Sequence, residues 1–258
     1  MGQEGIKESD QYGTTAMHDQ LRPLMRDFDA LMKKNDIRYA LTGGTLIGAV
    51  RDGGFIPWDD DLDIMVDREN YIKLLRLFHH PKQVGNLKIF DRLWIFRIAR
   101  RGQPEDRDGV PTLDVFVLDH FPKSRIKKKI KILLSWIMQG MMHTELKLEG
   151  MSLPYRICLV GTYYFGKLFT QKFKLRLFDR IMQLWNEKDG PVGCFTDLFG
   201  SVPVEYESDV MDHLTECEFE GMKLPIPVGY HNFLYVRYGD YMTPPEQEDR
   251  VPIHLGEK

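Results

Sequence analysis

The chain has 258 residues, 43% of them hydrophobic and 28% charged, so it can bury a core and does not resemble a disordered protein. Its formal net charge of -3 gives no support for a nucleic-acid partner, because nucleic-acid-binding domains are usually basic. The three cysteines are far apart and form no CxxC pair, so we expect reduced thiols rather than a disulfide framework or a zinc site. We find no signal peptide and no apolar stretch long enough to span a bilayer, and we therefore expect a cytoplasmic protein.

The first half of the chain alternates between helical and extended patterns. Apolar residues recur at helical spacing over residues 16–34 and again over 68–78, which predicts two amphipathic helices. A tight turn at 42–45 and a short helix at 46–51 lie between them. We expect strands at 37–41, 61–66, 87–90, 93–100 and 112–118. This order predicts an α/β (α+β) fold, a mixed sheet with helices packed on it.

The pattern changes after Pro122. Residues 123–131 include six basic side chains, an apolar run follows, and a second helical pattern covers 163–188. From residue 190 the sequence is rich in loops, with a hairpin expected at 218–224 and a short helix at 231–238. We therefore expect a catalytic core at 16–122, a helical annex at 123–189 and a C-terminal segment at 190–258 that packs back on the core.

An aspartate pair is the strongest chemical signal. Side chains alternate faces along a strand, so Asp61 and Asp63 would share one face at about 7 Å along the chain. Two carboxylates at that spacing repel each other unless a cation lies between them. Oxygen ligands favour Mg²⁺ or Mn²⁺. Clustered aspartates more often mark a solvated loop, but the alternating apolar residues Leu62, Ile64 and Val66 favour a strand in the core.

Asp114 is the second signal, because it interrupts an apolar run at 113–118 that reads as a buried strand. A buried charge needs a partner or a metal. An ion pair with an arginine is the commoner explanation for such a residue taken alone. Together with Asp61 and Asp63, it favours a three-carboxylate cage for metals that flank a phosphorus atom.

Gly43 and Gly44, followed by Thr45, form the third signal. Two glycines allow a close approach of the backbone to a ligand, and the helix that follows offers N–H groups to a phosphate. A Gly-Gly turn alone is weak evidence, but here it lies between a strand and a helix, shortly before the aspartate pair. Arg51 and Arg97 are further candidates for binding phosphate, and each also fits a surface ion pair.

These segments resemble the LicD family of phosphotransferases, whose core is shared by fukutin and the fukutin-related protein. The long match covers residues 41–51 and 54–64 and therefore contains both the glycine turn and the aspartates. Shorter matches cover 113–119 and 238–242, with Pro244, Pro245 and His254 nearby. Val117 stands where many members have proline, and residues 123–200 carry no family signature.

The resemblance implies a nucleotidyltransferase-type fold and the transfer of a phospho-alcohol, such as phosphocholine, from a CDP-activated donor to a sugar hydroxyl of a cell-surface glycan. CMP would be released. Asp61, Asp63 and Asp114 would hold Mg²⁺ or Mn²⁺, and Asp59 would be a further catalytic residue and the candidate base. Gly43, Gly44 and Thr45 would line the donor phosphates.

Two other functions use the same residues. A nucleotidyltransferase would attach a nucleoside monophosphate to an acceptor and release pyrophosphate, and an inactive relative would only bind glycans. The annex also has two interpretations. Its basic residues form the solvated face of a helix packed on the core, or residues 123–138 form an interfacial helix. The second interpretation places the protein at the inner face of the cell membrane, beside a lipid-linked glycan acceptor.

Overall fold

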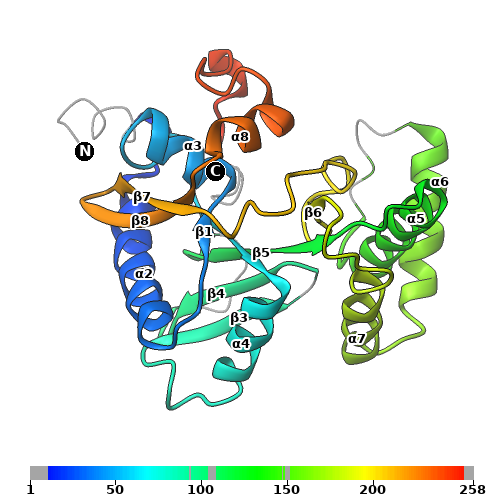
Figure 1. Cartoon of the computed structure of the whole chain (residues 1–258). Coiled ribbons are helices and arrows are strands. Elements are labelled where there is room, and N and C mark those ends of the chain that lie inside the picture. The colour runs from blue at the N-terminus through cyan, green and yellow to red at the C-terminus, as the bar shows by residue number, and fades with distance from the viewer. Residues whose placement is uncertain (1–10, 93, 104–108, 147, 149–151, 253–258) are drawn as a thin grey trace. The chain divides into compact units, whose positions relative to one another are not determined.

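The computed structural model describes residues 11–92, 94–103, 109–146, 148 and 152–252, which form two compact units (Figure 1). The first unit comprises the chain up to Asp91, Phe96–Val117, and the C-terminal part from Asp209. The second comprises Arg92–Ile95 and Leu118–Ser208. The expected annex therefore lies within the second unit. His254 of the family signature lies outside the described residues.

The first unit is built on a mixed sheet with the strand order β1-β2-β5-β4-β3. These strands are β1 (Ala40–Leu41), β2 (Leu62–Asp67), β5 (Leu113–His120), β4 (Phe96–Arg100) and β3 (Leu87–Arg92). β1 pairs antiparallel with β2, and β4 pairs antiparallel with β5. Because β2 and β5 are neighbours, the two segments that carry the predicted aspartates lie side by side.

Three helices accompany this sheet: α2 (Thr15–Lys34), α3 (Gly43–Arg51) and α4 (Arg68–Phe78). The apolar residues that predicted the first helix are all buried along α2, which accounts for its packing on the core. Asp67 ends β2 and caps α4, because its side chain accepts the backbone N–H of Asn70 at 2.7 Å. α3 follows β1 directly, and a loop of residues 52–61 then leads into β2. We call residues 52–61 the acidic loop.

The C-terminal part of the first unit contains the hairpin β7 (Leu214–Phe219) and β8 (Met222–Pro227), the helix α8 (Tyr230–Tyr238) and a short 3₁₀ turn (Gln247–Asp249). The strands of the hairpin pair antiparallel, with Phe219 opposite Met222. The two residues of its tight turn, Glu220 and Gly221, both have positive φ, which is the conformation that such hairpins favour.

The second unit contains α5 (Arg125–Met142), α6 (Leu153–Gly166), α7 (Gln171–Met182) and β6 (Val192–Cys194). β6 pairs antiparallel with the last residues of β5, Leu118 to His120. The helices enclose a separate hydrophobic core of Phe121, Met138, Met141, Met142, Phe178, Ile181, Met182, Phe195 and Val202. Among the described residues, no helix has both the length and the apolar character needed to cross a bilayer.

The expected mixed α/β fold is confirmed, but several element boundaries were wrong. α3 begins at Gly43, so the glycines form its first turn instead of a turn before it. β2 begins at Leu62, and Asp61 therefore precedes the strand. The helical pattern expected at 163–188 is split between α6 and α7, because the Thr170 hydroxyl caps a new helix by accepting the Phe173 N–H at 3.3 Å.

Candidate active site

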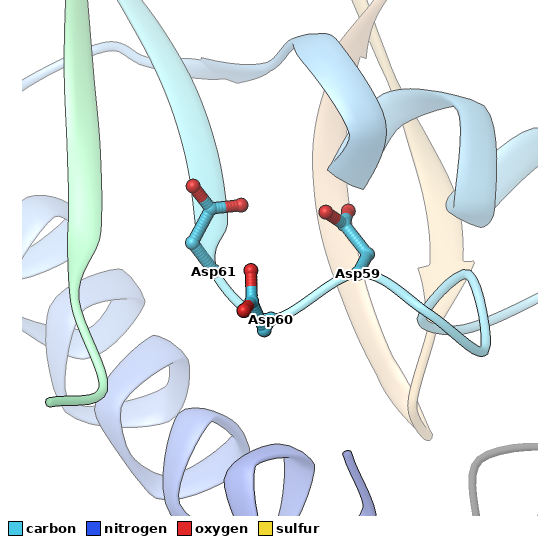
Figure 2. A group of neighbouring side chains, drawn as sticks. All are labelled: Asp59, Asp60 and Asp61. Carbon is cyan, nitrogen blue, oxygen red and sulfur yellow. The ribbon is translucent and has the colours of Figure 1, made fainter. Parts of the chain in front are cut away.

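The acidic loop brings three consecutive carboxylates together. Ligand oxygens of Asp59, Asp60 and Asp61 lie within 4.8 Å of one another. Figure 2 shows the three side chains on the segment that leads into β2, with their carboxylates on the same side of the loop. Asp60 is almost fully buried, which is unusual for a residue of a merely solvated acidic loop. The cluster is therefore anchored in the fold of the first unit through Asp60, while Asp59 and Asp61 are half-buried.

The start of α3 lies directly against these carboxylates. The Gly44 N–H donates to Oδ2 of Asp63 at 3.1 Å, and the Asp63 N–H donates to the Thr45 hydroxyl at 2.8 Å. A Cβ atom at Gly43 would overlap the Asp63 carboxylate, and one at Gly44 would overlap the Asp59 carboxylate. Gly43 also has φ +56°, which favours glycine. Both glycines therefore provide the close approach that the sequence predicted, and aspartates occupy part of the space.

Burial and the repulsion between neighbouring carboxylates raise the pKa values of two aspartates at this site, Asp59 and Asp63. The pKa of the Asp59 carboxyl is raised well above its usual value by burial and then by the neighbouring charges of Asp61 and Asp60. Burial likewise raises the pKa of Asp63, with further contributions from Asp61, Asp59 and Asp114. Such groups are costly to ionise together without a cation.

The donor set fits a divalent cation. Oδ2 of Asp59 is buried and has no hydrogen-bond partner within the described part of the chain. Carboxylate oxygens are the ligands that Mg²⁺ and Mn²⁺ prefer. Within the described parts of the chain, Asp59, Asp60 and Asp61 form a group close enough to hold one ion. Asp63 accepts the Gly44 N–H beside this group, and the charges of Asp61 and Asp59 act on it.

Asp114 forms an ion pair with an arginine and also acts on the charge of a neighbouring aspartate, Asp63. It lies opposite Arg97 on the neighbouring strand, and the Arg97 Nε–H contacts both of its carboxylate oxygens, at 3.1 and 3.0 Å. The ion pair considered from the sequence therefore exists. The charge of Asp114 nevertheless acts on Asp63, so it belongs to the same electrostatic environment. Arg97, expected as a phosphate-binding residue, is directed to Asp114 in this structure.

Arg51 lies at the end of α3 and is also engaged within the protein. Its guanidinium contacts Asp52 at 2.9 and 2.8 Å and donates to the Tyr241 carbonyl at 3.3 Å. It also lies 5.9 Å from the Trp58 ring, over which the guanidinium of Arg250 lies at 5.1 Å. The C-terminal family signature therefore contacts the region next to the acidic cluster.

Sequence reasoning did not select Asp60, because the alternation expected of a strand would have turned its side chain away from Asp61. The structure has a loop at this point, and alternation does not apply. Two other contributors to the site's surroundings, His18 and Glu220, were also missed. They are 41 and 165 residues from the acidic-loop residues that they contact, and no local pattern marks them.

Comparison with known proteins identifies the group to which this site belongs. Residues 36–102, which contain the start of α3 and the acidic loop, match the family model described as LicD/FKTN/FKRP, nucleotidyltransferase domain. Lipopolysaccharide cholinephosphotransferase LicD of Haemophilus influenzae is 28% identical over 255 residues, which cover 89% of this chain and 91% of the relative.

Two further relatives share a shorter region. An uncharacterized protein of Rickettsia prowazekii is 42% identical over 74 residues, covering 29% of this chain and 28% of the relative. A second, from Rickettsia typhi, is 46% identical over 65 residues, covering 25% of this chain and 21% of the relative. Residues 36–102 therefore match the LicD-type nucleotidyltransferase domain, and the chain is similar to the Haemophilus LicD protein along nearly its whole length.

Proposed function

We propose that this chain is a metal-dependent transferase that moves phosphocholine, or a related phospho-alcohol, from a CDP-activated donor to a sugar hydroxyl of a cell-surface glycan. The observation that carries the proposal is the carboxylate cluster that lies against the start of α3. The Haemophilus relative, which is similar along nearly its full length, is a lipopolysaccharide cholinephosphotransferase, and this supports choline as the alcohol and lipopolysaccharide as the kind of acceptor.

In the proposed reaction, an oxygen of the acceptor hydroxyl attacks the phosphorus atom that bears the alcohol. The bond between that phosphorus and the bridging oxygen of CMP breaks, and CMP leaves with the bonding electrons. In this proposal Asp61, Asp63 and Asp114 would hold the divalent cation, and Asp59 and Asp60, which group with Asp61 in the structure, are further candidate ligands. The cation would supply positive charge beside the donor pyrophosphate.

The protein's own residues have three tasks in this scheme. Gly43, Gly44 and Thr45 place the positive end of the α3 dipole next to the carboxylates, where donor phosphates would bind. Asp59 is the candidate base that would accept the proton of the acceptor hydroxyl. The ion pair between Arg97 and Asp114 fixes the β4 and β5 side of the site.

The alcohol could be recognised by an aromatic cage if it is choline. Tyr39 and Trp58, the aromatic residues close to the glycine turn and the aspartates, do not form an aromatic cage in this structure. Tyr39 is buried and donates to Asp29 at 2.8 Å, and the guanidinium groups of Arg51 and Arg250 lie over the Trp58 ring. We therefore assign recognition of the alcohol to other residues.

The test is a donor screen followed by product analysis. CDP-choline, CDP-ribitol, CDP-glycerol and CDP-ethanolamine are each added with Mg²⁺, and the donor that raises the melting temperature is incubated with a glycan acceptor. Release of CMP supports the proposal, and release of pyrophosphate from a nucleoside triphosphate supports the nucleotidyltransferase alternative. Asp61→Ala should abolish turnover. A wild-type chain that binds neither metal nor nucleotide in calorimetry would favour the inactive, glycan-binding alternative.

We also propose that α5 brings the protein to the inner face of the cell membrane, where a lipid-linked glycan acceptor would be available. Ile126, Ile130 and Leu133 are exposed on α5 at helical spacing, and the basic residues next to the two isoleucines in the sequence, Arg125, Lys127 and Lys129, are exposed as well. An apolar row bordered by basic residues is typical of helices that lie in a membrane interface.

A further inference from the structure

We propose that three side chains in one row at the N-terminal end of α2, the first of them on the residue that caps the helix, and a glutamate on the β7–β8 hairpin are positioning residues for the acidic loop. The residues are Thr14, His18, Arg22 and Glu220. This inference deepens the proposed function, because it states what holds the carboxylate cluster in place. All four residues and the acidic loop belong to the first unit.

Thr14, the N-cap of α2, and His18 and Arg22 within the helix are spaced four apart, which places them in one row. The Thr14 hydroxyl donates to the Pro57 carbonyl at 2.5 Å. Nε2 of His18 lies 2.7 Å from the Asp59 carbonyl. Thr14 and His18 are both fully buried, so these two bonds to the loop backbone are shielded from water.

His18 is fixed from two directions. Since the Asp59 carbonyl can only accept, Nε2 of His18 must carry the proton of this hydrogen bond. The imidazole also stacks on the Phe55 ring, with centroids 4.3 Å apart and an interplanar angle of 7°. The backbone oxygen of Asp59 is thereby held on the α2 side, while the Asp59 carboxylate lies against Gly44 of α3.

Glu220 holds the other end of the loop. Its carboxylate is 3% exposed and accepts the Arg22 Nε–H at 2.6 Å and the Phe55 N–H at 3.1 Å. A Cβ atom at Gly54 would overlap this carboxylate, so Gly54 and Glu220 are closely packed. Glu220 also adopts φ +53° at the tip of the hairpin, a conformation that is uncommon outside glycine. A buried carboxylate with two such donors stabilises the chain segments that supply them.

The arrangement has a chemical consequence. Neither His18 nor Glu220 belongs to the carboxylate cluster, but both bind backbone groups of the loop that carries it. Groups that orient metal ligands from outside the coordination sphere commonly change metal affinity by about 10–100-fold when they are removed. We therefore expect loss of these contacts to weaken metal binding without changing any carboxylate.

The first test uses His18→Leu, which removes the donor to Asp59 but fills similar space, and His18→Gln, which restores an N–H at a similar distance. His80→Leu is the control, because His80 is exposed. Binding of Mn²⁺ alone to the full chain is measured by titration calorimetry. We expect His18→Leu to weaken Mn²⁺ binding about tenfold, His18→Gln to recover most of it, and His80→Leu to match the wild type.

A second readout does not depend on metal or on catalysis. Amide hydrogen exchange should become faster in residues 52–61 of His18→Leu, and the same change should follow Glu220→Ala but not the exposed control Glu218→Ala. Unchanged exchange in the loop of both His18→Leu and Glu220→Ala would overturn the positioning role. If the wild-type chain binds no Mn²⁺ and transfers no phospho-alcohol, the proposed function fails, while the exchange data still decide the positioning role.

Discussion

Asp63 has two competing effects on the protein at the residue scale. It accepts the Gly44 N–H and thereby joins β2 to α3, but its charge faces those of Asp61, Asp59 and Asp114. A carboxyl whose pKa is raised on folding destabilises the folded state at pH values above its pKa in the unfolded chain. In the absence of metal, Asp63 therefore contributes a useful hydrogen bond and an unfavourable charge.

Asp63→Asn separates these two contributions, because the amide oxygen can still accept the Gly44 N–H. We expect the melting temperature in EDTA at neutral pH to rise by roughly 2–4 °C, which corresponds to about 1 kcal/mol for a chain of this size. Turnover should fall by about 100-fold, since one electrostatic contribution to the transition state is lost. Asp212→Asn, at an exposed site, is the control. A lower melting temperature for Asp63→Asn would show that repulsion does not dominate at this position.

Burial of His143 in the second unit predicts that the folding stability of the protein depends on pH. Burial next to the Trp94 ring, 4.9 Å away, lowers the pKa of His143 below its usual 6.5. A group with a depressed basic pKa stays neutral in the folded state while the unfolded chain takes up a proton. Above pH 6.5 His143 is neutral in both states and does not change the stability; as the pH falls from 6.5 toward the lower folded-state pKa, its burial increasingly destabilises the folded protein.

Urea unfolding at pH 7.5 and pH 5.5 tests this expectation, with wild type compared to His143→Gln. The variant should lose less stability on acidification than the wild type, because a glutamine side chain takes up no proton in this pH range. His80→Gln, at an exposed site, should lose as much as the wild type. Equal losses in wild type and His143→Gln would contradict the assignment.

At the scale of elements, α5 depends on a lysine that points inward. Lys131 is fully buried; its ammonium donates to the His120 carbonyl at 2.8 Å and to Oδ1 of Asn186 at 2.6 Å. It also lies 4.5 Å from the centroid of the Phe195 ring. Asn186 in turn donates to Asp119 at 3.1 Å, so the lysine connects α5 to the end of β5 and to the segment after α7.

We expect Lys131→Met to destabilise the protein by about 1–3 kcal/mol, because it leaves buried acceptors without a donor. Lys129→Met makes the same change two residues away on the exposed face of α5 and should cost less than about 0.5 kcal/mol. Chemical denaturation of the two variants measures the difference. Equal stabilities would mean that the apolar stem of Lys131, and not its charge, accounts for its burial.

The elements differ in how well the sequence predicted them. α2 was predicted to within a residue because its apolar residues follow one helical period without interruption. β1 was expected at 37–41 but comprises Ala40–Leu41, because strand length depends on partners that a local pattern does not reveal. The acidic segment was taken for strand because apolar residues alternate from Leu62, and nothing in the sequence shows that the loop extends through Asp61.

The residues of the candidate site also differ in how well the sequence predicted them, depending on how far apart they lie along the chain. The aspartates and glycines could be selected because they lie within a short, distinctive segment whose residue types have a chemical meaning together. The pairing of Arg97 with Asp114 was open from the sequence, since it depends on the register of β4 on β5. His18 and Glu220 could not be selected, because only the folded chain brings α2 and the hairpin to the acidic loop.

At the scale of the whole molecule, charge is divided unevenly along the chain. Residues 123–182 contain 13 basic and 3 acidic side chains, a formal +10, whereas the complete chain has -3. The rest of the chain therefore carries -13. Such a segregation gives a basic surface to one part of an acidic protein, and basic surface residues near an anionic bilayer contribute about 1 kcal/mol each.

The proposed membrane contact of α5 can be tested through this charge. Arg125→Glu combined with Lys129→Glu changes the net charge by -4 at two exposed positions on α5, and Lys82→Glu combined with Lys223→Glu makes an equal change at exposed positions of the first unit. Flotation with anionic liposomes should recover the wild type and the Lys82/Lys223 variant. Binding of the α5 variant should be weaker by at least about tenfold.

Salt and lipid composition then separate electrostatic attraction from apolar contact. At 1 M salt, where screening extends over only about 3 Å, wild-type binding should fall sharply, and neutral liposomes should recover little protein at any salt concentration. Equal loss in both charge variants would indicate an effect of net charge alone. Failure of the wild type to float with anionic liposomes at low salt would show that the exposed row of Ile126, Ile130 and Leu133 does not bind membranes, and analytical ultracentrifugation would then test whether it joins two copies of the chain.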